Sequence, residues 1–355
     1  MSVQCLPPGV DRGSGVSGAS SDRFLVTGAL GCIGAWTVRT LVRRGMPVVT
    51  YDLGSDRRRL QLLMTPAELD QVTFVTGDIT DLEQLQGALD KHEVNHVIHL
   101  AALQVPFCRA DPPLGARVNV VGTVNVFEAV RRRADRMGPI VYTSSVGMYA
   151  LDDADPVTGR LSSTATAHPI NHYGVYKLAN EGNARVYWLD NGVSSIGLRP
   201  MTVYGVGRDQ GMTSGPTKAI VAAVLGQPFT VPFRGPTLYQ YAEDVARALV
   251  AASLSSVLGA HTFNLPGVVA DGPTFLSAID EAVPGASELV AFEPVDLPFP
   301  SAIDHDGIEV LGPLAVTSLR EGVQATVDTY RSLESDGRLD PAEHGLAPAG
   351  ATRSG

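Results

Sequence analysis

Three glycines mark the stretch Gly28-Ala29-Leu30-Gly31-Cys32-Ile33-Gly34, which follows the apolar run Phe24-Leu25-Val26 and opens a helix-like segment at 35–44. A strand, a glycine turn and a helix in this order are typical of a site that binds dinucleotide phosphates. Gly28 allows a tight turn, Gly31 lets the backbone approach a pyrophosphate, and Gly34 permits close helix packing. The pyrophosphate would then lie at the positive N-terminus of the helix. An ordinary turn between strand and helix is the alternative, since glycines also mark plain loops.

A second predicted strand, 47–51, is followed by Asp52. This is about the distance downstream of the glycine turn at which an acid meets the ribose 2′-hydroxyl of a dinucleotide. A carboxylate there repels a 2′-phosphate, so Asp52 predicts NAD as the cofactor in preference to NADP. The basic cluster 57–59 would soften this preference if it folded back, but we expect it to be solvated.

Short apolar runs alternate with helical stretches from Phe24 to about Arg199. This alternation predicts an α/β fold with a doubly wound parallel sheet, the Rossmann arrangement. The clearest helices are expected at 115–136 and 173–190. Strands are expected near 23–27, 47–51, 72–76, 96–100, 139–143 and 194–199.

The pattern loosens after Pro200, where glycine and proline become frequent, and this predicts a smaller C-terminal substrate-binding lobe. Both ends of the chain are rich in small residues and are expected to be disordered. The expected boundaries are a leader (1–21), a Rossmann domain (22–199, with 237–265 returning to it), the lobe (200–236 and 266–335) and a tail (340–355).

Composition excludes several classes of function. The net charge of −10 argues against nucleic acid as a partner. The three cysteines are few and widely spaced, which favours a reducing, cytoplasmic environment without a disulfide framework. No apolar stretch approaches the length of a membrane span. The histidines show no spacing typical of metal ligands, so no metal is expected.

Four more motifs follow the glycine turn in order: Gly77-Asp78-Ile79-Thr80, Val97-Ile98-His99-Leu100-Ala101-Ala102, Tyr142-Thr143-Ser144-Ser145 and Tyr173-Gly174-Val175-Tyr176-Lys177. With the Gly-x-x-Gly-x-x-Gly spacing, this set resembles the extended short-chain dehydrogenase/reductases, the NAD-dependent epimerase/dehydratase family. The resemblance covers about residues 22–335. It implies NAD as the cofactor, a carbohydrate-like small molecule as the substrate and a homodimer built from the 115–136 and 173–190 helices.

Tyr173 and Lys177 are four residues apart on a predicted helix and therefore share one face. A phenol with a pKa near ~10 is a poor base at neutral pH, and a nearby ammonium group lowers that pKa. The resemblance implies that Tyr173 exchanges a proton with a secondary alcohol, Lys177 binds the nicotinamide ribose, and Ser145 holds the substrate oxygen. Ser144 is the alternative to Ser145. Taken alone, the Tyr-x-x-x-Lys spacing also occurs by chance in many helices.

The resemblance extends to binding residues. Asn119 matches a helix position that the family uses to hold the active site together, although an asparagine with an ordinary place in a helix is an almost equal alternative. The implied cofactor contacts are Gly28, Gly31, Cys32, Ile33, Gly34, Asp52, Asp78, Ile79, Leu100, Ala101, Ala102, Asn119 and Lys177. The implied substrate contacts are Gln104, Ser145, Met201, Thr202, Arg208 and Arg234.

The sequence departs from the family at the substrate phosphates. Thr237 stands about where one phosphate-binding arginine is expected, and the stretch 297–304 lacks the second. Val146 and Gly147 replace the acid pair of the dehydratases, which argues against dehydration. We therefore expect an NAD-dependent oxidoreductase that acts on a sugar-like alcohol without a nucleotide. A sugar or nucleotide-sugar epimerase with tightly bound NAD is the alternative. A non-catalytic NAD-binding sensor would require a broken Ser-Tyr-Lys set, and this set is intact.

Overall fold

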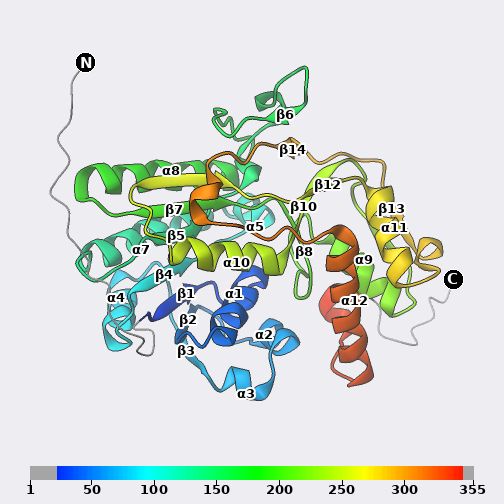
Figure 1. The fold of residues 1–355 in the computed structure, drawn as a ribbon, viewed down its shortest axis with the longest axis horizontal. Coiled ribbons are helices and arrows are strands. Elements are labelled where there is room, and N and C mark those ends of the chain that lie inside the picture. The colour runs from blue at the N-terminus through cyan, green and yellow to red at the C-terminus, as the bar shows by residue number, and fades with distance from the viewer. Residues whose placement is uncertain (1–21, 347–355) are drawn as a thin grey trace.

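A seven-stranded parallel sheet forms the centre of the computed structural model, which describes residues 22–346 (Figure 1). The strand order is β11-β7-β5-β4-β1-β2-β3, so the chain reverses its direction of growth between β1 and β4. The doubly wound α/β fold is thus confirmed. The strands are β1 (Phe24–Thr27), β2 (Val48–Asp52), β3 (Val72–Thr76), β4 (His96–His99), β5 (Ile140–Thr143), β7 (Ser195–Arg199) and β11 (Ala260–Asn264).

Helices cover both faces of this sheet. The burial of β1 on both faces explains why the sequence of this strand is apolar. Phe24 and Val26 pack into one core cluster with Trp36, whereas Leu25 packs into the other with Phe127. A parallel strand buried on both faces has no polar face to alternate with. The first face carries α1 (Cys32–Arg43) and α10 (Ala242–Ser253), and the second carries α4 (Leu82–Lys91), α7 (Gly122–Arg131) and α8 (His172–Asn191).

The two predicted long helices have different outcomes. The helix expected at 173–190 is α8, whose first turn is capped by Asn171 and whose end is Gly192 with φ 67°. The helix expected at 115–136 is divided into α6 (Pro112–Ala116), a π-helical turn η1 (Arg117–Val121) and α7. Shorter helices connect the other strands: α2 (Arg58–Leu63), α3 (Pro66–Leu69) and α5 (Val105–Ala110).

A second, three-stranded sheet lies beside the carboxyl ends of the large one (Figure 1). Within 237–265, α10 and β11 belong to the large sheet's layers, but β10 pairs with β8 and β12 in the small sheet. The lobe contains β8 (Thr202–Tyr204), α9 (Gly215–Val224), β9 (Phe229–Val231), β10 (Thr237–Tyr241), β12 (Val268–Ala270), α11 (Gly272–Ala282), β13 (Val290–Phe292) and α12 (Leu319–Ser335). A projecting arm carries β6 (Arg160–Leu161), which pairs with β14 (Ala302–Ile303) (Figure 1).

The tail expected from residue 340 is ordered as far as the structure describes it. Pro341–His344 forms a 3-10 turn. The His344 side chain is buried, and its ring centroid lies 5.3 Å from that of Tyr330. The expectation of disorder over 340–346 is therefore wrong, because a histidine and a leucine in this stretch bury against α12 and its neighbours. The predicted leader and residues 347–355 lie outside the described residues. Within 22–346, no helix is long and apolar enough to cross a membrane.

Candidate active site

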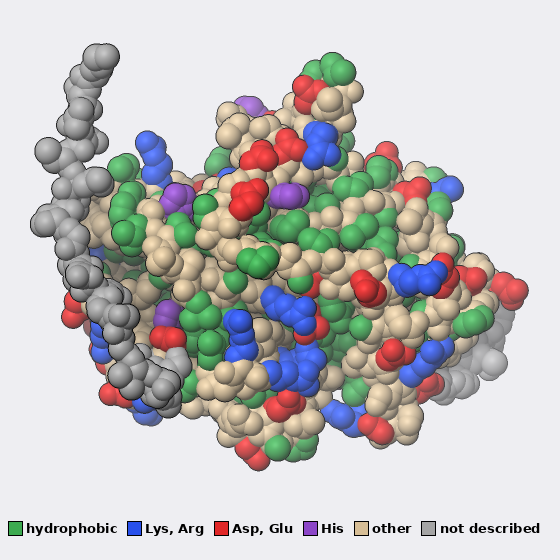
Figure 2. Space-filling model, viewed as in Figure 1, with side chains coloured by type: hydrophobic (Ala, Val, Ile, Leu, Met, Phe, Trp, Pro, Cys, Tyr) green, Lys and Arg blue, Asp and Glu red, His purple; other side chains and the backbone are tan. Residues whose placement is uncertain are grey.

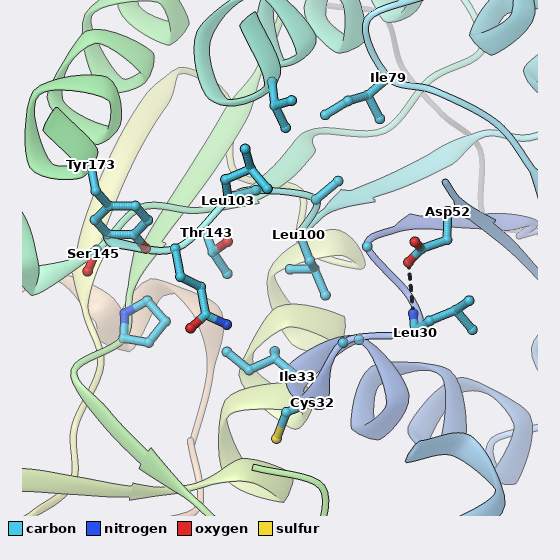
Figure 3. A pocket seen from close by; sticks show the side chains of 18 of the residues that line it. Leu30, Cys32, Ile33, Asp52, Ile79, Leu100, Leu103, Thr143, Ser145 and Tyr173 are labelled. Atoms are coloured by element: carbon cyan, nitrogen blue, oxygen red, sulfur yellow. Dashed lines mark hydrogen bonds between the residues drawn. The ribbon is translucent and has the colours of Figure 1, made fainter. Parts of the chain in front are cut away.

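A cavity of about 670 Å³ opens at the carboxyl ends of the central strands. It lies where the chain reverses direction between β1 and β4, which is the usual ligand position in an open α/β sheet. Figure 3 shows Asp52 at one end of this cavity, Tyr173 and Ser145 at the other, and Cys32 and Ile33 at the start of α1 between them. The cavity therefore joins the two groups of residues that the sequence predicted for cofactor and chemistry.

The glycine turn has the geometry that an anion site needs. Gly28 has φ +65°, and a Cβ there would meet the Ala101 backbone nitrogen at 2.5 Å. A Cβ on Gly34 would lie 2.2 Å from the Gly28 carbonyl oxygen, so Gly34 packs against the turn itself. Gly31 stands at the N-cap position of α1, and no side chain caps the free N–H groups of the first turn. The helix therefore presents its first N–H groups and its positive end to the cavity, as a pyrophosphate requires.

Asp52 lies at the end of β2, where it faces the glycine turn (Figure 3). Its carboxylate accepts hydrogen bonds from the backbone nitrogens of Leu30, at 3.0 Å, and Gly54, at 3.3 Å. Each carboxylate oxygen can accept more than one hydrogen bond, so capacity remains for a ribose hydroxyl. Asp78 also lines this end, and its Oδ1 accepts from the Thr80 nitrogen at 2.8 Å.

Most of the predicted cofactor residues line the cavity, and Asn119 does not. Asn119 is buried behind the wall, where its Oδ1 accepts from the Leu103 nitrogen at 2.7 Å and its Nδ2 donates to the Leu103 oxygen at 2.9 Å. It therefore holds the loop that follows β4 and makes no contact with the cavity. The predicted residues that line it are Gly28, Gly31, Cys32, Ile33, Gly34, Asp52, Asp78, Ile79, Leu100, Ala101, Ala102 and Lys177.

The predicted catalytic residues come together at the far end of the cavity. Ser145 follows β5, and its side chain lies beside that of Tyr173 at this end of the cavity (Figure 3). Lys177 lies one turn along α8, with its Nζ 5.5 Å from the centroid of the Tyr173 ring. The Lys177 ammonium donates to the Thr143 carbonyl oxygen at 2.6 Å, which ties α8 to the end of β5.

Burial dominates the electrostatics of this group. It lowers the pKa of Lys177 to about 8, while Cys108 and Glu181 oppose the change. Burial also raises the pKa of Tyr173, against the lowering effects of Ser145 and Arg208. The Tyr173 pKa is therefore raised, not lowered as expected, because burial outweighs the effects of Ser145 and Arg208.

Ser144 and Ser145 have different surroundings, which separates the two candidates. Ser144 Oγ is buried and donates to Glu181 Oε1 at 2.5 Å. Glu181 is in turn paired with Arg199, whose Nε and Nη2 lie 2.8 and 2.7 Å from its two carboxylate oxygens. Ser145 is only partly buried and lies beside Tyr173 at the cavity (Figure 3), with its Oγ accepting from the Gly147 nitrogen at 3.0 Å. Ser144 belongs to a buried network under the site.

The six predicted substrate residues divide into two groups. Gln104, Ser145, Met201 and Arg208 line the cavity. Thr202 does not, because it is fully buried and its hydroxyl lies 2.8 Å from that of Thr237 in the small sheet. Arg234 is exposed and also lies outside the lining. Both predictions are wrong as cavity contacts, because strand alternation turns Thr202 into the lobe and the chain after β9 carries Arg234 to the surface.

Sequence reasoning missed several lining residues. Arg59 belongs to the basic cluster that we expected to be solvated, yet its Nη2 lies 2.7 Å from Oδ1 of the buried Asp209. Its Nη1 also donates to the Leu30 oxygen at 3.0 Å. Figure 2 shows basic side chains gathered over α1 and α2 with acidic ones among them. Other lining residues without a sequence signal are Leu103, Leu114, Arg117, Met212, Thr213 and Phe299.

The fold and the site together are those of a dinucleotide-binding class of enzymes with a Ser-Tyr-Lys arrangement. The chain belongs to the NAD-dependent epimerase/dehydratase family, whose model matches residues 24–265. The chain is therefore an NAD-dependent enzyme of this family, and the glycine turn, the uncapped helix start and Asp52 fit NAD. The described residues contain no group of three histidine, cysteine or acidic side chains suited to a metal ion.

The relatives similar in sequence include sugar-nucleotide epimerases. The UDP-glucose 4-epimerase of Mycolicibacterium smegmatis is 32% identical over 320 residues, which cover 87% of this chain and 99% of that protein. UDP-glucuronate 4-epimerase 1 of Arabidopsis thaliana is 31% identical, over 66% of this chain and 53% of that protein.

Among solved structures, the UDP-glucose 4-epimerase of Thermus thermophilus in complex with NAD has a TM-score of 0.71 and 26% identity, over 87% of this chain and 99% of that one. A partial-consensus L-threonine 3-dehydrogenase has a TM-score of 0.77 with 22% identity over the same shares. The latter shows a common fold alone.

Proposed function

We propose that this protein transfers a hydride between NAD and a secondary alcohol of a small, sugar-like substrate that carries no nucleotide. The observation that supports this is the wall beyond Tyr173. That wall is built from a mixture of polar and apolar side chains. Neither of the two positions expected to bind a nucleotide diphosphate, Thr237 and the stretch 297–304, offers an arginine to the cavity. The residues there are Gln104, Met201, Arg208, Met212, Thr213 and Phe299.

The proposed chemistry uses the three residues gathered at this end. The Ser145 hydroxyl holds the substrate oxygen beside the Tyr173 phenol, which lines the same end of the cavity. Tyr173, as the phenolate, accepts the hydroxyl proton while the carbinol carbon loses its hydride and becomes a carbonyl carbon. Lys177, held by the Thr143 carbonyl, supplies positive charge beneath this proton transfer. Bound NAD supplies the acceptor for the hydride.

The nucleotide anchors are absent from the cavity for two separate reasons. Thr237 is fully buried against Thr202, so its position points into the lobe. The stretch 297–304, where the second arginine is expected, contains none, and the nearby Arg234 is exposed outside the lining. A lost hydrogen bond to a charged group costs about 1.5–3 kcal/mol, so two losses weaken UDP-sugar binding by several orders of magnitude.

A nucleotide-sugar 4-epimerase is the second candidate, and it is favoured by the 32% identity to the UDP-glucose 4-epimerase of M. smegmatis along almost its full length. The same Ser-Tyr-Lys set would serve it, with the hydride returned to the opposite face of the carbonyl. Such an enzyme must retain and turn its keto intermediate, and a nucleotide is the part that holds it.

Purified protein distinguishes these candidates. We expect continuous NADH formation, followed at 340 nm, with a panel of unlinked sugars, lactones and polyols. We also expect no micromolar binding of UDP or UDP-glucose in calorimetric titration of the NAD-loaded protein. Tightly bound NAD, interconversion of UDP-sugars and no net NADH would overturn the proposal in favour of the epimerase. Binding of NAD with neither activity would identify a sensor.

A further inference from the structure

Arg208 is a cation without an anionic partner at the substrate end of the cavity. It lies on the loop between β8 and α9, where its Nη2 is 3.2 Å from the Thr213 hydroxyl. Its Nε is buried and has no hydrogen-bond partner. The adjacent carboxylate, Asp209, is occupied by Arg58 and Arg59, at 3.1 and 2.7 Å. Among residues 22–346, no carboxylate therefore neutralises Arg208.

The acids that line the cavity lie at its other end. They are Asp52, Asp56 and Asp78, which follow β2 and β3 on the side of the glycine turn. The charge of Arg208 acts instead on Tyr173, whose pKa it lowers. The region around the reacting oxygen is thus positive, although the whole chain carries a net charge of −10.

Gly211 allows two polar side chains to converge here. Its φ is +98°, and a Cβ at this position would lie 2.2 Å from Gln104 Oε1 and 3.2 Å from an Nη atom of Arg208. The amide of Gln104 and the guanidinium of Arg208 therefore approach the same point of the loop backbone. With the Thr213 hydroxyl, which accepts from Arg208, they form a polar group that lines the cavity, and the guanidinium is its charged donor.

We propose that this group binds a carboxylate of the substrate, so that the substrate is a small polyhydroxy acid whose secondary alcohol faces Tyr173. The inference rests on the proposed function. A partly buried charge without a partner is unfavourable until an anion pairs with it. The planar guanidinium matches a carboxylate in two parallel hydrogen bonds, and a single cation balances a single negative charge. In the reaction the alcohol becomes a ketone, the proton goes to Tyr173 and the hydride to NAD, while the carboxylate is unchanged.

The test compares matched pairs of probes. Four- and six-carbon aldonates are assayed beside the alditols of the same length, which replace the carboxylate by a hydroxymethyl group. We expect at least about tenfold higher kcat/KM for an aldonate than for its alditol. Arg208→Gln should remove most of this preference by raising the aldonate KM, and Arg208→Lys should restore part of it. Arg234→Gln is the matched control, since that side chain lies outside the cavity.

Binding of NAD to Arg208→Gln is measured by fluorescence titration as a second readout, which does not depend on turnover. An unchanged Kd for NAD supports the proposal, whereas weakening equal to the loss of aldonate binding would assign Arg208 to the cofactor phosphates. Equal turnover of aldonates and alditols would overturn the carboxylate site and leave the proposed function standing. Micromolar UDP binding that depends on Arg208 would overturn both.

Discussion

At the scale of single residues, the site combines a phenol that resists ionisation with charges that favour it. Tyr173 is partly buried, which raises its pKa, while the Ser145 hydroxyl and the charge of Arg208 lower it. A group of this kind becomes an effective base only when its neighbours are correctly placed. We therefore expect turnover to depend on the Tyr173 hydroxyl and not on the aromatic ring that carries it.

Tyr173→Phe should reduce turnover by about 10²–10⁴-fold while the fold and NAD binding are retained, because only the hydroxyl is removed. Steady-state NADH formation and NAD titration are the measurements. Tyr176→Phe is the control, since the Tyr176 hydroxyl donates to the Pro112 carbonyl at 2.9 Å, away from Ser145. Turnover like that of the wild type in Tyr173→Phe would remove Tyr173 from the mechanism.

Asp52→Ser should shift the cofactor preference toward NADP. The carboxylate repels a 2′-phosphate, and serine removes this charge while it keeps a hydroxyl near the Leu30 nitrogen. The ratio of kcat/KM values for NAD and NADP should fall by about tenfold or more, as expected when one charge contact is lost. Equal use of both cofactors by the unmodified enzyme would contradict this role of Asp52.

At the scale of elements, α8 carries the reactive side chains and is fixed to the sheet by a buried ion pair. Glu181, one turn beyond Lys177, pairs with Arg199 of β7, and both side chains are about nine-tenths buried. Ser144 at the end of β5 joins the same carboxylate. One acid on α8 thus connects the helix to two neighbouring strands, and this connection sets how Tyr173 approaches Ser145.

Glu181→Ala should lower the free energy of unfolding by about 3–5 kcal/mol, because it leaves the Arg199 charge buried and unpaired. Urea unfolding at neutral pH is the measurement. The double variant Glu181→Leu with Arg199→Met should recover much of the loss, since it removes both charges and keeps apolar volume. A single-variant loss below about 1 kcal/mol would show that water reaches this pair.

At the scale of the whole molecule, the C-terminal stretch closes over the junction between the lobe and the glycine-turn side. His344 is buried against Tyr330, and Glu343 lies 3.5 Å from Arg58, the partner of Asp209. Burial lowers the pKa of His344 to about 4, with Arg58 and Lys218 adding to the effect and Asp209 opposing it. The docking of this stretch is thus linked to pH.

Stability should therefore fall as the pH falls from about 6.5 toward 4. In this window the unfolded chain, with an ordinary histidine pKa, binds more protons than the folded one, so protonation favours unfolding. The loss assigned to His344 is on the order of 2 kcal/mol at pH 5. Urea midpoints of the wild type and of His344→Phe at pH 7 and pH 5 measure it. An equal fall in both proteins would show that other groups cause the pH dependence.

The homodimer stays a prediction at this scale. Val186 and Leu189 on α8 are 53% and 64% exposed, which suits a helical interface between copies. Sedimentation of the purified protein measures it.

The sequence alone predicted the places of six central strands along the chain, the doubly wound sheet, NAD as the cofactor and the glycine turn with its Asp52; β11 and the strand order came from the structure. The predicted features depend on local patterns: apolar runs, glycine spacing and the distance along the chain between neighbouring motifs. The family resemblance implied that Ser145 and Tyr173 act together, and the two side chains lie at the same end of the cavity.

Only the tertiary structure decided which side chains face the cavity beyond that edge. Thr202 meets Thr237, 35 residues away, and Arg59 meets Asp209, 150 residues away. No local pattern encodes such pairings, because they follow from how the lobe packs on the sheet. For the same reason the structure alone placed Asn119 behind the wall, Arg234 at the surface and His344 in the core. The unpaired charge of Arg208 could likewise be recognised only from the structure. Asp209 follows it in the sequence but pairs in space with Arg58 and Arg59.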